Sequence, residues 1–131
     1  MEKYTYEQLL EIIAALRGEN GCPWDKAQTH ESMIKCLRNE CVEVVEAIEK
    51  KDDENLCEEL GDVLLQVLLH AQIASEEGRF TMSEVVDGLA KKMVRRHPHV
   101  FGGAPAALTP EEGLASWNAI KAMEKKEKEK H

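Results

Sequence analysis

The sequence predicts an all-α fold, organised as a bundle of four to five helices. Hydrophobic residues make up 43% and charged residues 32% of the 131 residues, whereas aromatic residues make up only 5%. This balance is typical of helical globular proteins and differs from that of aromatic-rich β-sheet proteins and of disordered chains. Apolar residues also recur at helical spacing between clear start and stop signals, which divide the chain into five segments.

The first helix is predicted to begin after Thr5, because Thr5 and Gln8 have the spacing of a capping box. It runs to about Arg17 and is ended by Gly18 and Gly21. Residues 21–28 are predicted to form a loop.

A long second helix is predicted from Thr29, which can cap it, to about Lys51. Asp52 and Asp53 then mark a tight turn. The helical spacing of its apolar residues predicts one main core face. The residues of this face are Ile34, Leu37, Cys41, Val44, Val45 and Ile48.

The third helix is predicted over about residues 54–77, with Gly78 just after its end. Residues 56–74 are apolar over most of the helix circumference, which predicts the central and most buried helix. Its own chain leaves part of this apolar surface uncovered. We therefore expect the protein to dimerise through its long helices.

The fourth helix is predicted to begin at the capping box of Thr81 and Glu84 and to stop near His97. A second capping box, Thr109 with Glu112, opens the last helix. Together the helices predict a single domain over residues 1–123. The highly charged tail, residues 124–131, is expected to fray.

Charge and hydropathy exclude several classes of partner. The formal net charge of −8 leaves no broad cationic surface, so we expect no nucleic-acid partner. No charged segment followed by an apolar run opens the sequence, and no apolar stretch has the length of a membrane span. We therefore expect a soluble, cytoplasmic protein without a membrane partner.

The four cysteines favour reduced thiols over a zinc site or a disulfide framework. They have no C-x-x-C spacing, and three of them fall within helical apolar patterns, where a free thiol acts as a small hydrophobe. The four cysteines are Cys22, Cys36, Cys41 and Cys57.

Two acidic pairs carry the strongest chemical signal. Glu40 with Glu43, and Glu59 with Asp62, each have the spacing that places two side chains on one helical face. If the two helices form an antiparallel hairpin, the four carboxylates converge on one point, where their repulsion demands a cation or a shifted proton. An all-oxygen site of this kind suits magnesium or manganese, whereas zinc would recruit His or Cys.

The alternative is that both pairs belong to solvated helix edges, since acidic residues at helical spacing are common on surfaces. Glu40 and Glu43 share their stripe with the less polar Met33, Cys36 and Ala47. Their stripe is therefore not the most polar side of the helix. This placement favours a position against another protein surface, where a carboxylate needs a partner.

A basic cluster of Lys92, Arg95 and Arg96 ends the fourth helix, where it could bind phosphate or simply complement the helix dipole. Trp24 and Trp117 could stack on a base or serve ordinary packing. The histidines form no metal-binding pattern, and His30 and His70 are isolated in the sequence.

Several ordered motifs resemble the MazG nucleoside triphosphate pyrophosphohydrolases, whose signature is E-E-x-x-E followed by E-x-x-D. Here the signature reads N-E-C-V-E at residues 39–43 and E-L-G-D at residues 59–62. The resemblance extends to G-C-P-W-D-K-A-Q-T-H at 21–30, E-E-G-R-F at 76–80 and R-R-H-P-H-V-F at 95–101. It covers nearly the whole chain, and several motifs in order are more specific than paired acids.

The resemblance implies a MazG-like helical bundle that hydrolyses nucleoside triphosphates to the monophosphate and pyrophosphate, as in house-cleaning of the nucleotide pool. It implies that Mg²⁺, with Mn²⁺ as a substitute, is held by the four catalytic carboxylates. It also implies that Lys92, Arg95 or Arg96 holds phosphate. A substrate role for Trp117, Asn118 and Lys121 comes from the resemblance as well. The family's helical dimers agree with a homodimer, with a tetramer as an open alternative.

One departure from the signature is Asn39, which replaces the first glutamate. Asn39 lies one residue, or about 100° of helix, from Glu40, so it need not share the same ligand point. We expect the four-carboxylate core to survive. The substitution keeps open a second hypothesis, a catalytically weak or inactive nucleotide-binding regulatory helical dimer. A purely structural dimer is a third hypothesis, which does not depend on Asn39.

Overall fold

The computed structural model describes residues 2–106 and 109–130, and every regular element in those ranges is helical. The prediction of an all-α fold is therefore confirmed. The elements are α1 (Tyr6–Leu16), α2 (Pro23–Ala27), the 3₁₀ helix η1 (Glu31–Met33), α3 (Ile34–Glu49), α4 (Asp53–Glu76), α5 (Met82–Arg96), α6 (Pro98–Phe101) and α7 (Pro110–Lys130). Across the described ranges, no helix combines the length and the apolar character needed to cross a membrane.

The chain divides into two compact units, with the boundary between Met82 and Ser83. The single domain over residues 1–123 stays a prediction. Unit 1 contains α1 to α4, and unit 2 contains nearly all of α5 together with α6 and α7.

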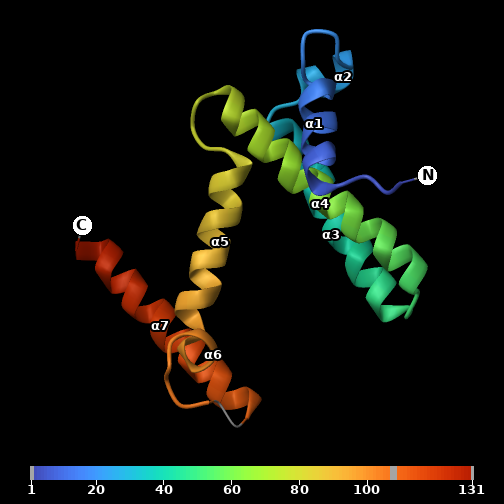
Figure 1. Ribbon diagram of the computed structural model, residues 1–131. Helices are drawn as coiled ribbons and strands as arrows, with labels where there is room; N and C mark the ends of the chain where they lie inside the picture. The colour runs from blue at the N-terminus through green and yellow to red at the C-terminus, as the bar shows by residue number, and fades with distance from the viewer. Residues whose placement is uncertain (1, 107–108, 131) are drawn as a thin grey trace. The chain divides into compact units, whose positions relative to one another are not determined.

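Helices α3 and α4 form an antiparallel hairpin in unit 1 and lie side by side (Figure 1). Lys51 adopts a left-handed φ of 57° in the turn between them. Asp52 caps α4, because its side chain accepts a hydrogen bond from the backbone N–H of Asn55 at 3.1 Å. The predicted turn is thus confirmed. Gly78, with φ of 71°, follows the other end of α4, as expected of a glycine after a helix C-terminus.

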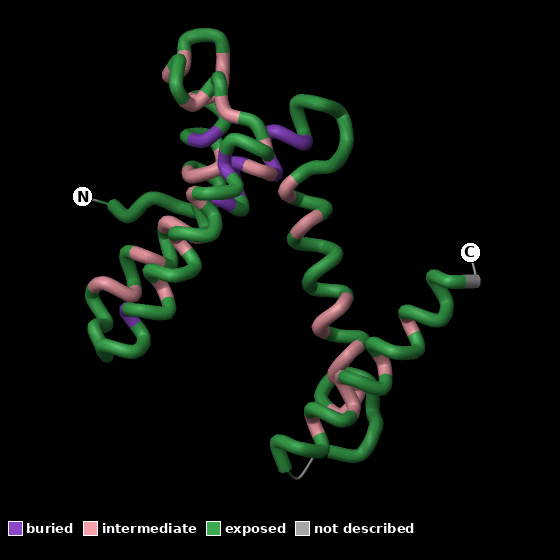
Figure 2. Tube along the Cα trace, turned by 180° about the vertical axis from the view of Figure 1, so that it is seen from behind, coloured by how far each residue is buried: buried purple, intermediate pink, exposed green. Residues whose placement is uncertain are grey.

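The hydrophobic core lies where α1 meets the C-terminal half of α4. Its buried members are Ile13 of α1, Met33 of η1, and Leu68 and Leu69 of α4. Partly buried residues packed against them are Leu9, Leu10, Leu16, Cys36 and Met82. Figure 2 shows the buried positions gathered in this part of unit 1. Six residues of α4 are buried, so it is the most buried described helix, as predicted.

The predicted main core face of α3 was wrong within this chain. Ile34, Val45 and Ile48 are 46%, 51% and 56% exposed. The buried positions are instead Met33 and Ala47, which lie on the stripe shared with Glu40 and Glu43. Helical periodicity identifies an apolar face but not the neighbour that covers it. Here α4 packs against the stripe that contains Met33 and Ala47. Ile34, Val45 and Ile48 therefore stay exposed.

Arg17 anchors the connection between α1 and α3. Its side chain is only 7% exposed, pairs with Glu76 of α4 at 2.9 Å and donates to the Gln28 carbonyl at 3.0 Å. Within this connection, predicted to be a loop, Pro23–Ala27 forms the short helix α2, with proline at its first position, where no N–H is required. Thr29 caps a turn, accepting from the Ser32 N–H at 3.0 Å, and α3 itself begins after η1.

Unit 2 has no fully buried residue among those that the structure describes. The fourth predicted helix corresponds to α5, which ends at Arg96, close to the predicted stop near His97. The short helix α6 begins directly after His97. The sequence predicts fraying from residue 124, but α7 continues as helix to Lys130. Several large apolar side chains of unit 2 are exposed. They include Val86, Leu89, Val94, Val100, Phe101, Leu114 and Met123.

Two glycines provide a matched test of the fold. A Cβ at Gly21 would lie 2.1 Å from the backbone oxygen of Leu16, whereas a Cβ at Gly88 would meet nothing within 4 Å. We expect Gly21→Ala to destabilise the protein by more than about 1 kcal/mol. Gly88→Ala should stabilise it by about 0.5–1 kcal/mol, because alanine favours a helix interior. Urea unfolding followed by circular dichroism measures both changes, and equal stability of the two variants would contradict the described loop.

Candidate metal centre

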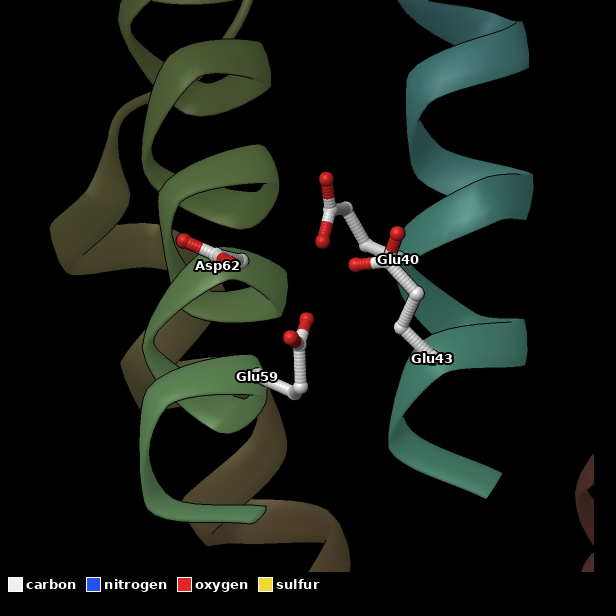
Figure 3. A group of neighbouring side chains, drawn as sticks. All are labelled: Glu40, Glu43, Glu59 and Asp62. Atoms are coloured by element: carbon white, nitrogen blue, oxygen red, sulfur yellow. The ribbon is translucent and has the colours of Figure 1, made fainter. Parts of the chain in front are cut away.

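Four carboxylates converge between α3 and α4. Glu40 and Glu43 come from α3, and Glu59 and Asp62 come from α4. One oxygen from each carboxylate lies within 4.8 Å of the oxygens of the other three. Figure 3 shows Glu40 and Glu43 reaching from α3 towards α4, where Glu59 and Asp62 lie. The convergence predicted from the two spacings is therefore present.

Burial and mutual repulsion shift the ionisation of this cluster. A hydrogen bond with Glu43, followed by burial and the charges of Glu43, Asp62 and Glu40, raises the pKa of Glu59 to about 7. Burial, followed by the charge of Glu43, raises the pKa of Glu40. Without a cation the cluster therefore retains a proton close to neutral pH.

Two of the carboxylate oxygens are poorly satisfied by the protein itself. Glu40 Oε2 and Glu59 Oε2 are both buried without a hydrogen-bond partner. Buried polar atoms normally have a partner, and an unpartnered carboxylate oxygen is costly. A hard divalent cation binds such oxygens well, and the donor set consists of carboxylates alone. The four residues therefore fit a divalent cation.

Asn39 does not disturb the convergence. It is exposed on α3, one position before Glu40, while the four carboxylates of the cluster come together without it.

The basic residues singled out by the sequence gather in unit 2. Lys92, Arg95 and Arg96 from α5 and Lys121 from α7 line a cavity of about 740 Å³, which we call the basic groove. The remaining lining residues are Glu124, Lys125, Glu127 and Lys128. Four of the six predicted substrate-binding residues thus share one surface.

The other two predicted substrate-binding residues lie outside the lining of the basic groove. Trp117 is half-buried, with its ring 4.6 Å from the Arg96 guanidinium and 5.5 Å from the His97 ring. The sequence alternative of a packing role for Trp117 is thus realised in the contacts with Arg96 and His97. Asn118 is exposed on α7. Trp24, in contrast, is 58% exposed on α2.

Glu124 is a residue of the groove that sequence reasoning missed. Its Oε1 accepts from Arg95 Nε, and its Oε2 accepts from Arg96 Nε at 3.0 Å. The sequence signal was weak, because Glu124 opens a run of alternating charges that resembles a solvated tail.

The structure also unites two histidines that are isolated in the sequence. The rings of His30 and His70 are stacked with centroids 5.0 Å apart, and their Nδ1 atoms are 2.7 Å apart. Arg79 contacts His30 Nε2 and can only donate, so the proton of His30 belongs on Nδ1. His30 then donates to His70 Nδ1, and burial, followed by the proximity of His30, lowers the pKa of His70. This contact ties the segment before α3 to α4.

Comparison with known proteins agrees with this arrangement. The MazG nucleotide pyrophosphohydrolase domain matches residues 28–101, more than half of the chain, including both acidic pairs. The chain belongs to the MazG family.

Several named relatives match along almost the whole chain. It is 50% identical to the nucleoside triphosphate pyrophosphohydrolase/pyrophosphatase MazG of Thermotoga maritima, over 94% of this chain and 46% of that protein. It is 44% identical to the nucleoside triphosphate pyrophosphohydrolase of Escherichia coli, over 95% of this chain and 48% of that protein. Identity to the uncharacterized protein YabN of Bacillus subtilis is 51%, over 95% of this chain and 26% of that protein. The chain therefore spans about half or less of the length of these relatives.

A solved structure supports the fold. The crystal structure of a mazG-related protein from Thermotoga maritima superposes with a TM-score of 0.70 at 33% identity. The match covers 88% of this chain and 98% of the other.

The raised pKa of Glu59 predicts a pH-dependent difference in stability between the wild type and Glu59→Gln, both measured free of metal. Glu59 binds its proton more tightly when folded, so it contributes stability at low pH that is lost as the pH rises towards about 7. The melting temperature of Glu59→Gln, which cannot ionise, should therefore rise relative to the wild type between pH of about 5 and 7. The comparison between variants removes the contributions of other titrating groups, such as His70. A constant difference across this range would contradict the described repulsion.

Proposed function

We propose that the chain hydrolyses nucleoside triphosphates to the monophosphate and pyrophosphate with a divalent cation, magnesium being preferred and manganese a substitute. Such an activity would serve house-cleaning of the nucleotide pool, and the cytoplasmic location predicted from the sequence suits it. The reaction is the one for which the Thermotoga maritima and Escherichia coli relatives are named, and the proposed site consists of residues of this chain.

The observation that carries the proposal is the four-carboxylate cluster with its two unpartnered buried oxygens. Magnesium commonly bridges protein carboxylates to substrate phosphates and tolerates few ligands other than oxygen. A chain of this family with four converging carboxylates has the donors for that bridge. Glu40, Glu43, Glu59 and Asp62 are therefore proposed as both the metal ligands and the catalytic residues.

In the proposed reaction, water attacks the α-phosphorus. The bond from that phosphorus to the oxygen bridging the α- and β-phosphates breaks, and pyrophosphate leaves with that oxygen. A bound divalent cation would supply charge neutralisation and Lewis acidity at the phosphates. The carboxylates hold the site in place, and one carboxylate oxygen accepts the proton of the attacking water.

The basic groove is proposed to bind the triphosphate through Lys92, Arg95, Arg96 and Lys121, whose cationic groups suit phosphate oxygens. Trp117 and Asn118 are proposed to contribute to the nucleoside end.

A second candidate function is a nucleotide-binding regulatory dimer with weak or no turnover. The observation that favours it is Asn39 in place of the glutamate that opens the family signature. This hypothesis expects tight binding of nucleotide without release of pyrophosphate.

A homodimer is proposed because a large apolar surface of α3 and α4 lies uncovered. On α3 the exposed residues are Ile34, Val45 and Ile48, and on α4 they are Leu60, Leu64, Leu65 and Val67. Extended apolar patches of this kind mark association surfaces. A second copy would cover this face with an identical one, as in a twofold dimer; a tetramer remains the open alternative.

Product analysis tests the proposed reaction. With magnesium and a panel of canonical, deoxy and oxidised triphosphates, we expect monophosphate and pyrophosphate in equal amounts. Glu59→Ala and Asp62→Ala should each lower turnover by at least about 100-fold while the far-ultraviolet circular dichroism stays helical, because each removes a ligand. Glu46→Gln, an exposed change on the polar side of α3, is the matched control. Release of orthophosphate alone would reject attack at the α-phosphorus.

Asn39→Glu separates the two candidate functions. If Asn39 limits catalysis, restoring the glutamate should raise turnover while nucleotide binding stays similar. Wild-type protein that binds nucleotide tightly but gives no pyrophosphate with magnesium or manganese would favour the regulatory dimer.

The proposed dimer is tested by analytical ultracentrifugation. Ile48→Glu places a charge on the exposed apolar face of α3 and should shift the protein towards the monomer, because burying that charge is costly. Lys50→Glu introduces the same residue on the opposite side of the helix and should leave the assembly intact. A wild-type protein that is monomeric at micromolar concentration would exclude this interface.

A further inference from the structure

We propose that Glu124 is a positioning residue that holds Arg95 and Arg96 together as a phosphate-binding pair in the basic groove. This inference deepens the proposed function and rests on its assignment of the groove to phosphate. It concerns a residue outside the family signature and outside the substrate-binding set predicted from the sequence.

Glu124 engages both arginines at once, each through a different carboxylate oxygen. Arg95 donates through Nε to Oε1, while Arg96 approaches Oε2 through Nε at 3.0 Å and Nη2 at 2.9 Å. The hydrogen bonds from Arg95 and then Arg96 lower the pKa of Glu124 to about 2. Glu124 is therefore ionised at neutral pH.

The shared carboxylate solves a geometric problem. Arg95 and Arg96 are consecutive on α5, so their side chains leave the helix about 100° apart. Two guanidinium groups also repel each other. Glu124, reaching across from α7, offers one acceptor that both can contact and thereby brings them together.

The two arginines are held to different degrees. The Arg96 side chain is 11% exposed, uses two nitrogens on Glu124 and lies against the Trp117 ring at 4.6 Å. The Arg95 side chain is 52% exposed and donates to Glu124 through Nε alone. Within the described residues no hydrogen bond engages its two terminal nitrogens, so they are available to a phosphate. Arg96 thus serves as the anchor and Arg95 as the exposed donor.

Simple electrostatics and positioning predict opposite effects of removing the charge of Glu124. Loss of a negative charge makes the groove more positive, which by itself strengthens the binding of anions. If Glu124 positions the arginines, its removal lets their side chains separate. Binding of a phosphate must then order both side chains, and the conformational entropy lost weakens the binding. Only positioning predicts weaker binding after the loss of a negative charge.

The experiment compares Glu124→Gln with Glu129→Gln, which removes the same charge from the same helix outside the lining of the groove. Binding of inorganic pyrophosphate is measured by calorimetry, and KM and kcat are measured with a triphosphate and magnesium. We expect Glu124→Gln to weaken pyrophosphate binding and to raise KM by about tenfold, with a much smaller change in kcat. Glu124→Asp should recover part of the loss, and Glu129→Gln should resemble the wild type. A merely structural role would lower the melting temperature without this division between KM and kcat.

A further variant, Arg95→Gln, separates this inference from the proposed function. Pyrophosphate binding is read without turnover, so an inactive protein still tests the role of Glu124. If Arg95→Gln loses binding while Glu124→Gln binds as tightly as the wild type or more tightly, positioning is overturned and the phosphate site stands. If Arg95→Gln binds pyrophosphate as the wild type does, the groove is not the phosphate site. The assignment of the groove to phosphate and the positioning role of Glu124 are then both rejected.

Discussion

Repulsion among four carboxylates is the constraint around which unit 1 is organised. The hairpin of α3 and α4 holds one oxygen of each within 4.8 Å of the others. Such an arrangement opposes folding unless packing elsewhere outweighs it. The turn capped by Asp52 and the core at the C-terminal half of α4 supply that packing. Burial raises the pKa of Glu40, and a hydrogen bond with Glu43 raises that of Glu59; in both carboxyls the neighbouring negative charges add to the shift. The gathered carboxylates give the hairpin its capacity for a cation.

The same packing of α3 on α4 also creates the exposed apolar surface. Because α4 lies against the stripe of Met33 and Ala47, the acidic pair on that stripe is drawn inward. The larger residues of α3, among them Val45 and Ile48, are left outside. A rotation of α3 that buried these residues would carry Glu40 and Glu43 away from α4. The carboxylate site and the proposed association surface therefore both follow from the face of α3 that packs against α4.

Unit 2 is held together differently. It has no fully buried residue in its described part, and α5 and α7 are joined instead by Glu124, its two arginines and the ring of Trp117. Acidic groups dominate the site in unit 1, and cationic groups dominate the basic groove in unit 2. Carboxylate oxygens suit a divalent cation, whereas guanidinium and ammonium groups suit anionic oxygens, so the two units carry sites of opposite charge.

The all-α class and the positions of the long helices were determined by the sequence alone, because each depends on local spacing and capping. The spacing also placed each acidic pair on one helical face, but the two pairs converge only because α4 packs against that face of α3. The Thr5 capping box, the Asp52 turn and Gly78 are short-range features of this kind. Only the tertiary structure decided which face of α3 is buried, because periodicity does not say what will cover a face. It alone paired His30 with His70 and Glu124 with two arginines, since these contacts join residues 40, 29 and 28 positions apart. Contacts at such separations depend on how helices pack, and no local pattern in the chain encodes them.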